Sequence, residues 1–260
     1  MSSLKTVLDG VTEDGGVWRF EGAEGWSQGR TLFGGMTLAL CAHVASRALT
    51  ELPALRSAQV AFVGPAAGPL TLTATELRRG RSATIAAVDC AAASGLAARA
   101  ILTYGGPRES AVAHDRTPAP SRPEPEECPP FLTPDRAENG FFRQFEMRAA
   151  GGTRPFEGGA PDYRVWVRLK DAAGVDAVIG LLAIADSLPP AAMSAFPAPA
   201  PISTMTWSID LSPPVASDGW LLLSSSSEQA QDGYSLQAMN VWDASGRRLA
   251  TGRQVVAIFA

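Results

Sequence analysis

The chain has 260 residues, of which 46% are hydrophobic and 18% are charged, and its formal net charge is −4. The negative charge argues against nucleic acid as the main partner, because phosphate groups are bound by basic surfaces. Residues 1–5 lack the apolar core of a signal peptide, and no apolar run reaches the ~20 residues of a membrane span. We therefore expect a cytoplasmic protein that binds neither nucleic acid nor a membrane.

The three cysteines, Cys41, Cys90 and Cys128, lie far apart in the sequence. Their number is odd, and their spacing does not suit a metal site. We expect all of them to be small buried side chains in a reducing compartment. The sequence predicts no metal and no redox cofactor.

The first predicted elements are a strand over Gly16–Glu21 and, after glycine-rich turns, a long helix. Gly34 and Gly35 precede this helix, and Met36–Leu49 contains no proline or glycine and consists mostly of good helix formers. Its polar residues form one narrow stripe, at His43, Ser46, Arg47 and Thr50. A helix that is apolar on its other sides must be covered, so we expect it to lie in the concave face of a curved sheet.

Strand-like segments separated by turn signals follow the helix. Polar and apolar residues alternate in them, which is typical of antiparallel strands with one buried face. These predicted strands cover Ser57–Val63, Leu70–Leu77, Ser82–Ala91 and Leu96–Tyr104. A proline-rich linker is then predicted over residues 107–136, extended and semi-rigid where the prolines cluster.

The second half repeats the plan of the first. A shorter apolar helix is predicted over Val175–Ala185. Predicted strands flank it, at Phe141–Met147, Tyr163–Leu169, Ile202–Leu211, Trp220–Glu228, Leu236–Trp242 and Leu249–Phe259. Corresponding turn positions, Ser82 with Ser235 and Leu96 with Leu249, share one separation of 153 residues. This layout indicates a tandem duplication.

The duplication predicts an N-terminal repeat over residues 1–106, the linker over 107–136, and a C-terminal repeat over 137–260. A single curved sheet would leave an open edge, so we expect the two copies to pair edge to edge in one long sheet. A helix wrapped by a curved antiparallel sheet, present twice, is the double hot-dog fold of the α+β class.

Several segments carry a resemblance to a known family. Residues 26–35, with the sequence WSQGRTLFGG, resemble the start of the central helix in the acyl-CoA thioesterase II (TesB-like) family. Residues 185–190, 203–211 and 249–254 are similar to the second half of the same family. The resemblance covers almost the whole chain except the linker, and it rests on the ordered set of segments.

The resemblance implies an enzyme that hydrolyses acyl-CoA thioesters to the free acid and CoA. In this family an Asp, a Thr or Ser, and a Gln orient a water for direct attack, without an acyl-enzyme. Carried over to this chain, these residues are Asp186, Thr204 and Gln254. CoA then enters as part of the substrate, and no cofactor is implied. The oligomeric state stays open, although a homo-oligomer is compatible with the fold.

Asp186 follows the apolar helix of the second half, where the negative end of the helix dipole disfavours the charged carboxylate. Burial would raise its pKa further, which suits a general base. The alternative is a solvated or turn-capping aspartate. Gln254 lies in an apolar strand, on the face of Val256, and if that face is buried its amide needs hydrogen-bond partners. The 153-residue separation makes Ile101 its counterpart, so we place the chemistry in the second half only.

Other candidate residues remain open from the sequence. Ser203 and Thr206 compete with Thr204 for the hydroxyl role. The N–H groups of Gly34 and Gly35 could hold the thioester carbonyl oxygen, or the two glycines could simply permit close packing of helix on sheet. Arg30 could bind a CoA phosphate or only be exposed.

Two alternative functions remain. The hot-dog fold also supports enoyl-CoA hydration or dehydration with an Asp–His pair, but no histidine lies near Asp186 in the sequence. The second alternative is a non-catalytic protein that binds acyl-CoA or lipid. It is kept because Met205, Thr206 and Trp207, next to Thr204, replace the Asp–His more usual in the family.

Overall fold

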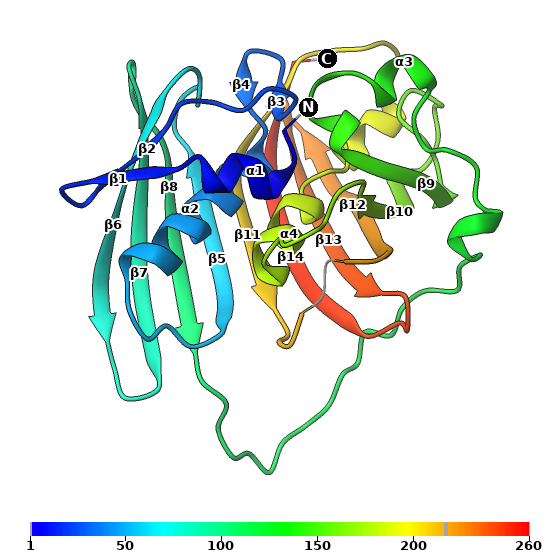
Figure 1. Ribbon diagram of the computed structural model, residues 1–260. Coiled ribbons are helices and arrows are strands. Elements are labelled where there is room, and N and C mark those ends of the chain that lie inside the picture. The colour runs from blue at the N-terminus through cyan, green and yellow to red at the C-terminus, as the bar shows by residue number, and fades with distance from the viewer. Residues whose placement is uncertain (1, 216–217, 260) are drawn as a thin grey trace.

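Two helices lie in the concave face of a single antiparallel sheet of 12 strands in the computed structural model (Figure 1). The structure describes residues 2–215 and 218–259. A separate two-stranded hairpin, β3 (Ser27–Gln28) and β4 (Thr31–Leu32), leads into the first helix. The arrangement confirms the predicted α+β double hot-dog fold.

The first repeat is built around helix α2 (Gly34–Ala48), as predicted. Its strands are β1 (Thr12–Asp14), β2 (Val17–Phe20), β5 (Leu55–Phe62), β6 (Leu70–Arg79), β7 (Ala83–Ala92) and β8 (Gly95–Gly105). The sequence did not predict the short N-terminal helix α1 (Leu4–Asp9), which is capped by the side chain of Ser3.

The second repeat is built around helix α4 (Ala177–Ala185). Its strands are β9 (Phe145–Gly152), β10 (Asp162–Leu169), β11 (Ile202–Leu211), β12 (Leu221–Gln231), β13 (Tyr234–Asp243) and β14 (Arg248–Ile258). Short helical turns connect these elements, at η1 (Pro125–Glu127), α3 (Pro134–Ala137), η2 (Gly140–Gln144) and η3 (Ala191–Ala195). Residues 141–144 thus form a 3₁₀ turn, where the sequence predicted the start of a strand.

The order of the strands shows the duplication directly. It reads β1-β2-β6-β7-β8-β5 in the first repeat and continues β11-β14-β13-β12-β10-β9 in the second, so each strand has a counterpart at the mirrored position. The repeats join where β5 pairs antiparallel with β11, and Val60 faces Trp207 near the middle of this junction. The predicted edge-to-edge pairing is confirmed, and it removes one exposed edge from each repeat.

Helices α2 and α4 pack against each other in the concave face of the sheet. Ten residues of α2 are buried, whereas Ser46 and Arg47 are exposed and His43 is half-buried. The predicted polar stripe therefore lies on a side of this helix that reaches solvent. Asp176 precedes helix α4, and its side chain accepts hydrogen bonds from the N–H groups of Val178 and Ile179, a typical N-cap.

The proline-rich segment does more than connect the repeats. From Thr117 onward it crosses the outer face of the second repeat, where the indole N–H of Trp242 donates to the carbonyl of Thr117 at 3.2 Å. The indole N–H of Trp166 likewise donates to the carbonyl of Pro123 at 2.9 Å. This segment therefore buries apolar side chains that the alternation of β10 and β13 turns away from the core.

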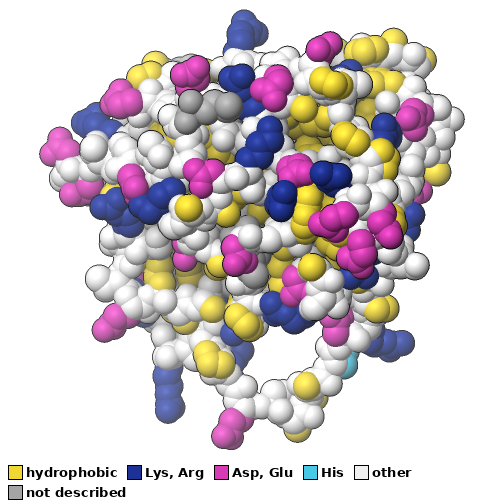
Figure 2. All heavy atoms as spheres, turned by 45° about the vertical axis from the view of Figure 1, so that its right-hand side comes forward, with side chains coloured by type: hydrophobic (Ala, Val, Ile, Leu, Met, Phe, Trp, Pro, Cys, Tyr) yellow, Lys and Arg dark blue, Asp and Glu magenta, His cyan; other side chains and the backbone are white. Residues whose placement is uncertain are grey.

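Cys41, Cys90 and Cys128 are all buried and free, as predicted. Among the described residues, no helix is long and apolar enough to cross a membrane. Figure 2 shows Lys and Arg side chains interspersed with Asp and Glu over the visible face, so neither sign of charge dominates it.

Candidate active site

Asp186 ends helix α4, at the position that caps its C-terminus. Pro189 and Pro190 follow within four residues and cannot continue a helix. The end of α4 meets the beginning of α2, the helix of the other repeat. As a result the Asp186 carboxylate lies between the negative end of its own helix and the positive end of α2. Only the first of these two helix ends was expected from the sequence.

The carboxylate of Asp186 has two hydrogen-bond donors. Nε2 of Gln254 donates to Oδ1 at 2.5 Å, and the backbone N–H of Gly35 donates to the same carboxylate. Burial raises the pKa of Asp186 to about 7, while the bonds from Gln254 and Gly35 oppose this increase. The predicted upward shift is confirmed, and burial is its largest cause. A carboxyl group with this pKa is partly ionised near neutral pH and can accept a proton from water.

The two glycines that begin α2 permit a very close approach between the helices. A Cβ on Gly34 would lie 2.6 Å from Oδ2 of Asp186, and a Cβ on Gly35 would lie 2.9 Å from the carbonyl oxygen of Ala183 in α4. Both distances are too short for a side chain. Close packing is therefore a real role of these glycines. The nearest partner is the C-terminal end of α4, and for Gly34 the ring of Phe62 on strand β5 follows at 3.2 Å, so the helix is also close to the sheet there. A role in substrate binding stays a prediction.

Gln254 lies on the inner face of β14 and is only 5% exposed. Its predicted first-repeat counterpart was wrong. Ile101 is half-buried and lies between the buried Ala100 and Leu102, so its side chain is on the outer face of the sheet. A one-residue error in the separation moves a residue to the other face of a strand. If Val60 and Trp207, which face each other across the junction of the repeats, are taken as equivalent positions, the counterpart is Ala100, since Ala100 pairs with Val60 just as Gln254 pairs with Trp207. Ala100 is also apolar, so the first repeat still lacks this amide.

Thr204 reaches the inner face through an irregularity in β11. The register of β11 against β14 shifts between Thr204 and Thr206, which leaves Met205 as an extra, exposed residue. Such a bulge changes the face on which the following residues lie. Thr204 consequently lines the same cleft as Asp186, whereas Thr206 lines the cavity on the opposite face. Of the competing hydroxyls, the structure excludes Thr206 from the cleft but retains Ser203.

The cleft has a volume of about 670 Å³ and lies where the two repeats meet. It brings together Asp186, Thr204, Gln254 and Gly34. Gly35 is buried behind it, and Arg30 is exposed outside the lining, although its neighbours Gly29 and Thr31 belong to it. Most of the remaining lining is apolar, including Phe62, Phe141, Phe142, Leu188, Met193 and Ile202.

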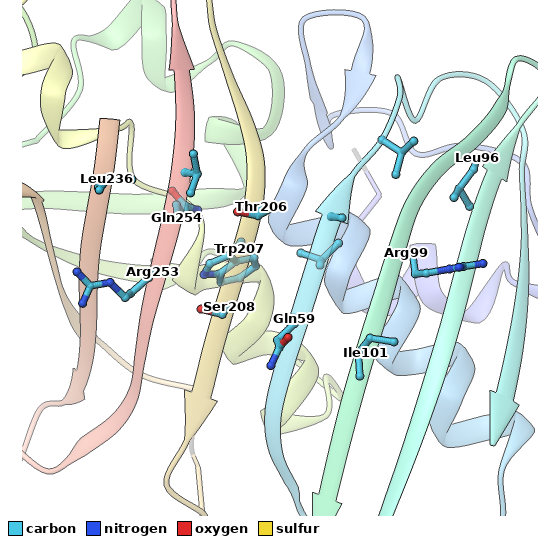
Figure 3. A pocket seen from close by; sticks show the side chains of 14 residues that line it. Gln59, Leu96, Arg99, Ile101, Thr206, Trp207, Ser208, Leu236, Arg253 and Gln254 are labelled. Atoms are coloured by element: carbon cyan, nitrogen blue, oxygen red, sulfur yellow. The ribbon is translucent and has the colours of Figure 1, made fainter. Parts of the chain in front are cut away.

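A second cavity, of about 690 Å³, lies on the outer face of the sheet, away from the helices (Figure 3). Its charged residues are Arg99 and Arg253, and each of them is paired with a surface carboxylate, Asp89 and Glu228 respectively. Among the described residues that line it there is no carboxyl group with a raised pKa, so the inner cleft is the better candidate for catalysis.

Gln237 on β13 was not predicted as a site residue. It is 2% exposed, and its Nε2 donates to Oε1 of Gln254 at 2.9 Å. A signal for it was present in the sequence, because alternation along β13 places this amide on the same face as the apolar Met239 and Val241. Within the described part of the chain, no group of His, Cys, Asp or Glu could hold a metal ion.

Comparison with protein families gives two consecutive matches along the chain. Residues 23–105 match the acyl-CoA thioesterase N-terminal domain, and residues 125–258 match the acyl-CoA thioesterase C-terminal domain. The chain belongs to the acyl-CoA thioesterase family. The predicted resemblance to its TesB-like members is thereby confirmed. A search of curated proteins finds no match.

Solved structures with the same fold accompany this family assignment. A hot-dog protein from Alicyclobacillus acidocaldarius is 23% identical with a TM-score of 0.89, over 99% of this chain and 98% of that one. The acyl-CoA thioesterase II TesB2 of Mycobacterium marinum is 18% identical with a TM-score of 0.79, over 98% of both chains. A TesB protein of Mycobacterium avium subspecies paratuberculosis is 16% identical with a TM-score of 0.81, over 99% and 98%. Each of these three structures matches this chain over almost its whole length.

Proposed function

We propose that this member of the acyl-CoA thioesterase family hydrolyses acyl-CoA thioesters by direct attack of water, with Asp186 as the general base. One observation carries the proposal. A carboxylate whose pKa is raised to about 7 faces a cleft of about 670 Å³ and is held there by the side chain of Gln254. A base is most effective when its pKa lies near the working pH.

In the proposed reaction a water molecule lies between the Asp186 carboxylate and the thioester carbonyl carbon. Asp186 takes one proton as the water oxygen forms a bond to that carbon. The resulting tetrahedral intermediate breaks its carbon–sulfur bond, and the CoA thiolate takes the proton from Asp186. The products are the carboxylic acid and CoA, and Asp186 is again ionised. No covalent bond to the protein forms at any step.

Thr204 and Gly34 complete the proposed machinery. Thr204 lines the same cleft as Asp186, and we propose that its hydroxyl holds the water together with Asp186. Gly34 is the first residue of α2, and an N–H in the first turn of a helix has no acceptor within that helix. We propose that it donates to the thioester oxygen as negative charge develops there. The N–H of Gly35 is less suited, because it already donates to Asp186.

The lining of the cleft also supports an acyl-CoA substrate. Its aromatic and aliphatic side chains suit an acyl chain. Arg136 lines the cleft and Arg30 lies beside it, and both suit the phosphate groups of CoA. An enoyl-CoA hydratase with an Asp–His pair is less well supported, because none of the described residues lining the cleft is a histidine.

Release of free thiol from a panel of acyl-CoAs of increasing chain length tests this proposal. We expect turnover with the wild-type protein and at least a 100-fold loss with Asp186→Asn, which removes the base but keeps the shape. Thermal unfolding with each acyl-CoA is measured alongside. Protection by acyl-CoA without thiol release from any chain length would support a binding protein instead. Loss of enoyl absorbance without free thiol would support a hydratase.

A further inference from the structure

An unbroken series of hydrogen bonds ends on Asp186. The backbone N–H of Ala191 donates to Oε1 of Gln237 at 2.6 Å, and Nε2 of Gln237 donates to Oε1 of Gln254 at 2.9 Å. Nε2 of Gln254 then donates to Oδ1 of Asp186. We call these four residues the amide relay. Gln237 and Gln254 are both buried, at 2% and 5% exposed, so their amides have little access to bulk water.

The relay has a fixed direction because its first member can only donate. A backbone N–H group is a donor and carries no acceptor atom, so Gln237 must turn its side-chain oxygen toward Ala191. Its NH₂ group then faces Gln254, which must turn its own oxygen toward Gln237 and its NH₂ group toward Asp186. A reversed Gln254 would place two NH₂ groups against each other and a carbonyl oxygen against the carboxylate. Both contacts would be repulsive.

The position of Ala191 explains why its N–H is available. It follows Pro189 and Pro190, which have no N–H, and it begins the 3₁₀ turn η3, so no acceptor exists within that turn. Asp186 and Ala191 are the first and last residues of the segment over residues 186–191. Gln237 therefore connects the two ends of this segment, directly through Ala191 and indirectly through Gln254.

The first repeat shows that the fold does not itself need these amides. One row of paired residues on the inner face crosses the junction between the repeats, in the order Val88, Ala100, Val60, Trp207, Gln254 and Gln237. Figure 3 labels Trp207 and Gln254 of this row on neighbouring strands. Val88 and Ala100 occupy the places of Gln237 and Gln254 and pack as buried apolar side chains. The pair of amides is confined to the repeat that carries Asp186.

We propose that Gln237 is a positioning residue for this site: through Gln254 it holds a hydrogen-bond donor against Asp186 and so favours the ionised base. The role of this residue in turnover rests on the proposed thioester hydrolysis, whereas its effect on Asp186 does not. The other charged side chain that lines the cleft is Arg136, on α3. Burial, the Gln254 amide and the Gly35 N–H are the influences on the Asp186 carboxyl group.

The direct test is a titration of the Asp186 carboxyl group by carbon-detected NMR, with Asp186→Asn to assign the signal. Gln237→Met keeps the length of the side chain but removes both its donor and its acceptor. We expect the midpoint of Asp186 to rise by about one pH unit in this variant, because the Gln254 donor is no longer held in place. The acid limb of the pH–rate profile for acyl-CoA hydrolysis should move by the same amount, and kcat should fall about 10-fold.

Ser235→Ala is the matched control. Ser235 is fully buried on the same strand and the same face as Gln237. Its hydroxyl forms a hydrogen bond with that of Ser227 at 2.8 Å, outside the relay. We expect neither the midpoint nor the pH profile to change in this variant. Should Gln237→Met fail to fold, Gln237→Glu retains the acceptor for Ala191 but, once ionised, cannot donate to Gln254. In Gln237→Glu the titration midpoint of Asp186 should rise further than in Gln237→Met, because this substitution also adds a negative charge.

The outcomes separate the two proposals. An unchanged midpoint in folded Gln237→Met, or in Gln237→Glu with its new carboxyl group ionised, overturns the relay, whatever the wild-type activity. A raised midpoint in a protein that releases no thiol from any acyl-CoA supports the relay and refutes the proposed hydrolysis. A raised midpoint together with a shifted acid limb supports both.

Discussion

Gly34 of the first repeat lies against Asp186 of the second so closely that a Cβ on Gly34 would be 2.6 Å from the Oδ2 atom of Asp186. The candidate site is therefore shared between the repeats. The second repeat supplies the carboxylate, the amide and the hydroxyl, and the first supplies the beginning of helix α2. A single repeat would hold only part of this arrangement.

Gly34→Ala should inactivate the protein without unfolding it. The added methyl group would meet Oδ2 of Asp186 at 2.6 Å and the ring of Phe62 at 3.2 Å, so the carboxylate must move. A displacement of this kind typically costs about 100-fold in rate, while overpacking costs roughly 1–3 kcal/mol of stability. Thiol release and thermal unfolding check both expectations.

Gly10→Ala is the control for that substitution. Gly10 follows α1, its φ of −76° suits alanine, and the nearest atom to an added Cβ is 3.4 Å away. Activity should stay at the wild-type level. Wild-type activity in Gly34→Ala as well would show that the close approach to Asp186 has no part in the reaction.

The rate of hydrolysis should depend on pH through Asp186. Only the ionised carboxylate can accept a proton, and its pKa is raised to about 7 by burial. We therefore expect kcat/KM to rise tenfold per pH unit below about pH 6 and to level off above about pH 8. Thiol release measured across this range, with a thiol reagent that works at low pH, checks the profile. A rate that is flat between pH 5 and 8 would exclude Asp186 as the base.

The same shift predicts a pH-dependent stability. The folded protein binds the Asp186 proton more tightly than the unfolded chain, in which an aspartate has a pKa of about 3.9. Stability contributed by this proton is fully present below about pH 4 and is lost as the pH rises through about 7. Asp186→Asn does not titrate, so its free energy of unfolding relative to wild type should improve by roughly 2–4 kcal/mol between pH 5 and pH 8.

Urea unfolding at the two pH values measures this difference. Asp210→Asn is the control, because the side chain of Asp210 is exposed on β11 and folding does not remove it from water. A difference between Asp186→Asn and wild type that does not change with pH would mean that folding does not raise the pKa of Asp186.

The sequence predicted most of the fold because the signals that specify it are local. Alternation located the strands, and the run from Met36 to Leu49 located the long helix. Duplication then implied the shared sheet. The surroundings of Asp186 were less predictable, because the N–H of Gly35 reaches it from the helix of the other repeat. A contact between helices that are far apart in sequence leaves no periodic signal.

Register explains the remaining differences. Strand residues change face with every position, so the choice of Ile101 as the counterpart of Gln254 failed by a single residue, and Ala100 is the structural counterpart. No signal in the sequence predicts the bulge at Met205 either. Regular alternation would place Thr204 and Thr206 on one face, whereas the structure separates them.

That separation provides the last prediction. Thr204 lines the cleft with Asp186, and Thr206 lines the cavity on the outer face, although only one residue lies between them. Thr204→Val keeps the shape of the side chain but removes the hydroxyl proposed to hold the water. We expect kcat to fall about 10- to 100-fold, with little change in unfolding temperature because the half-buried site is open to solvent.

Thr206→Val is the matched control, since it makes the same chemical change on the opposite face of the same strand. Its activity should equal that of the wild type. Ser203→Ala completes the series, because Ser203 lines the cleft as well. A loss of rate in Ser203→Ala but not in Thr204→Val would assign the hydroxyl to Ser203. Equal losses in Thr204→Val and Thr206→Val would indicate an effect on strand β11 as a whole and would remove Thr204 from the proposed site.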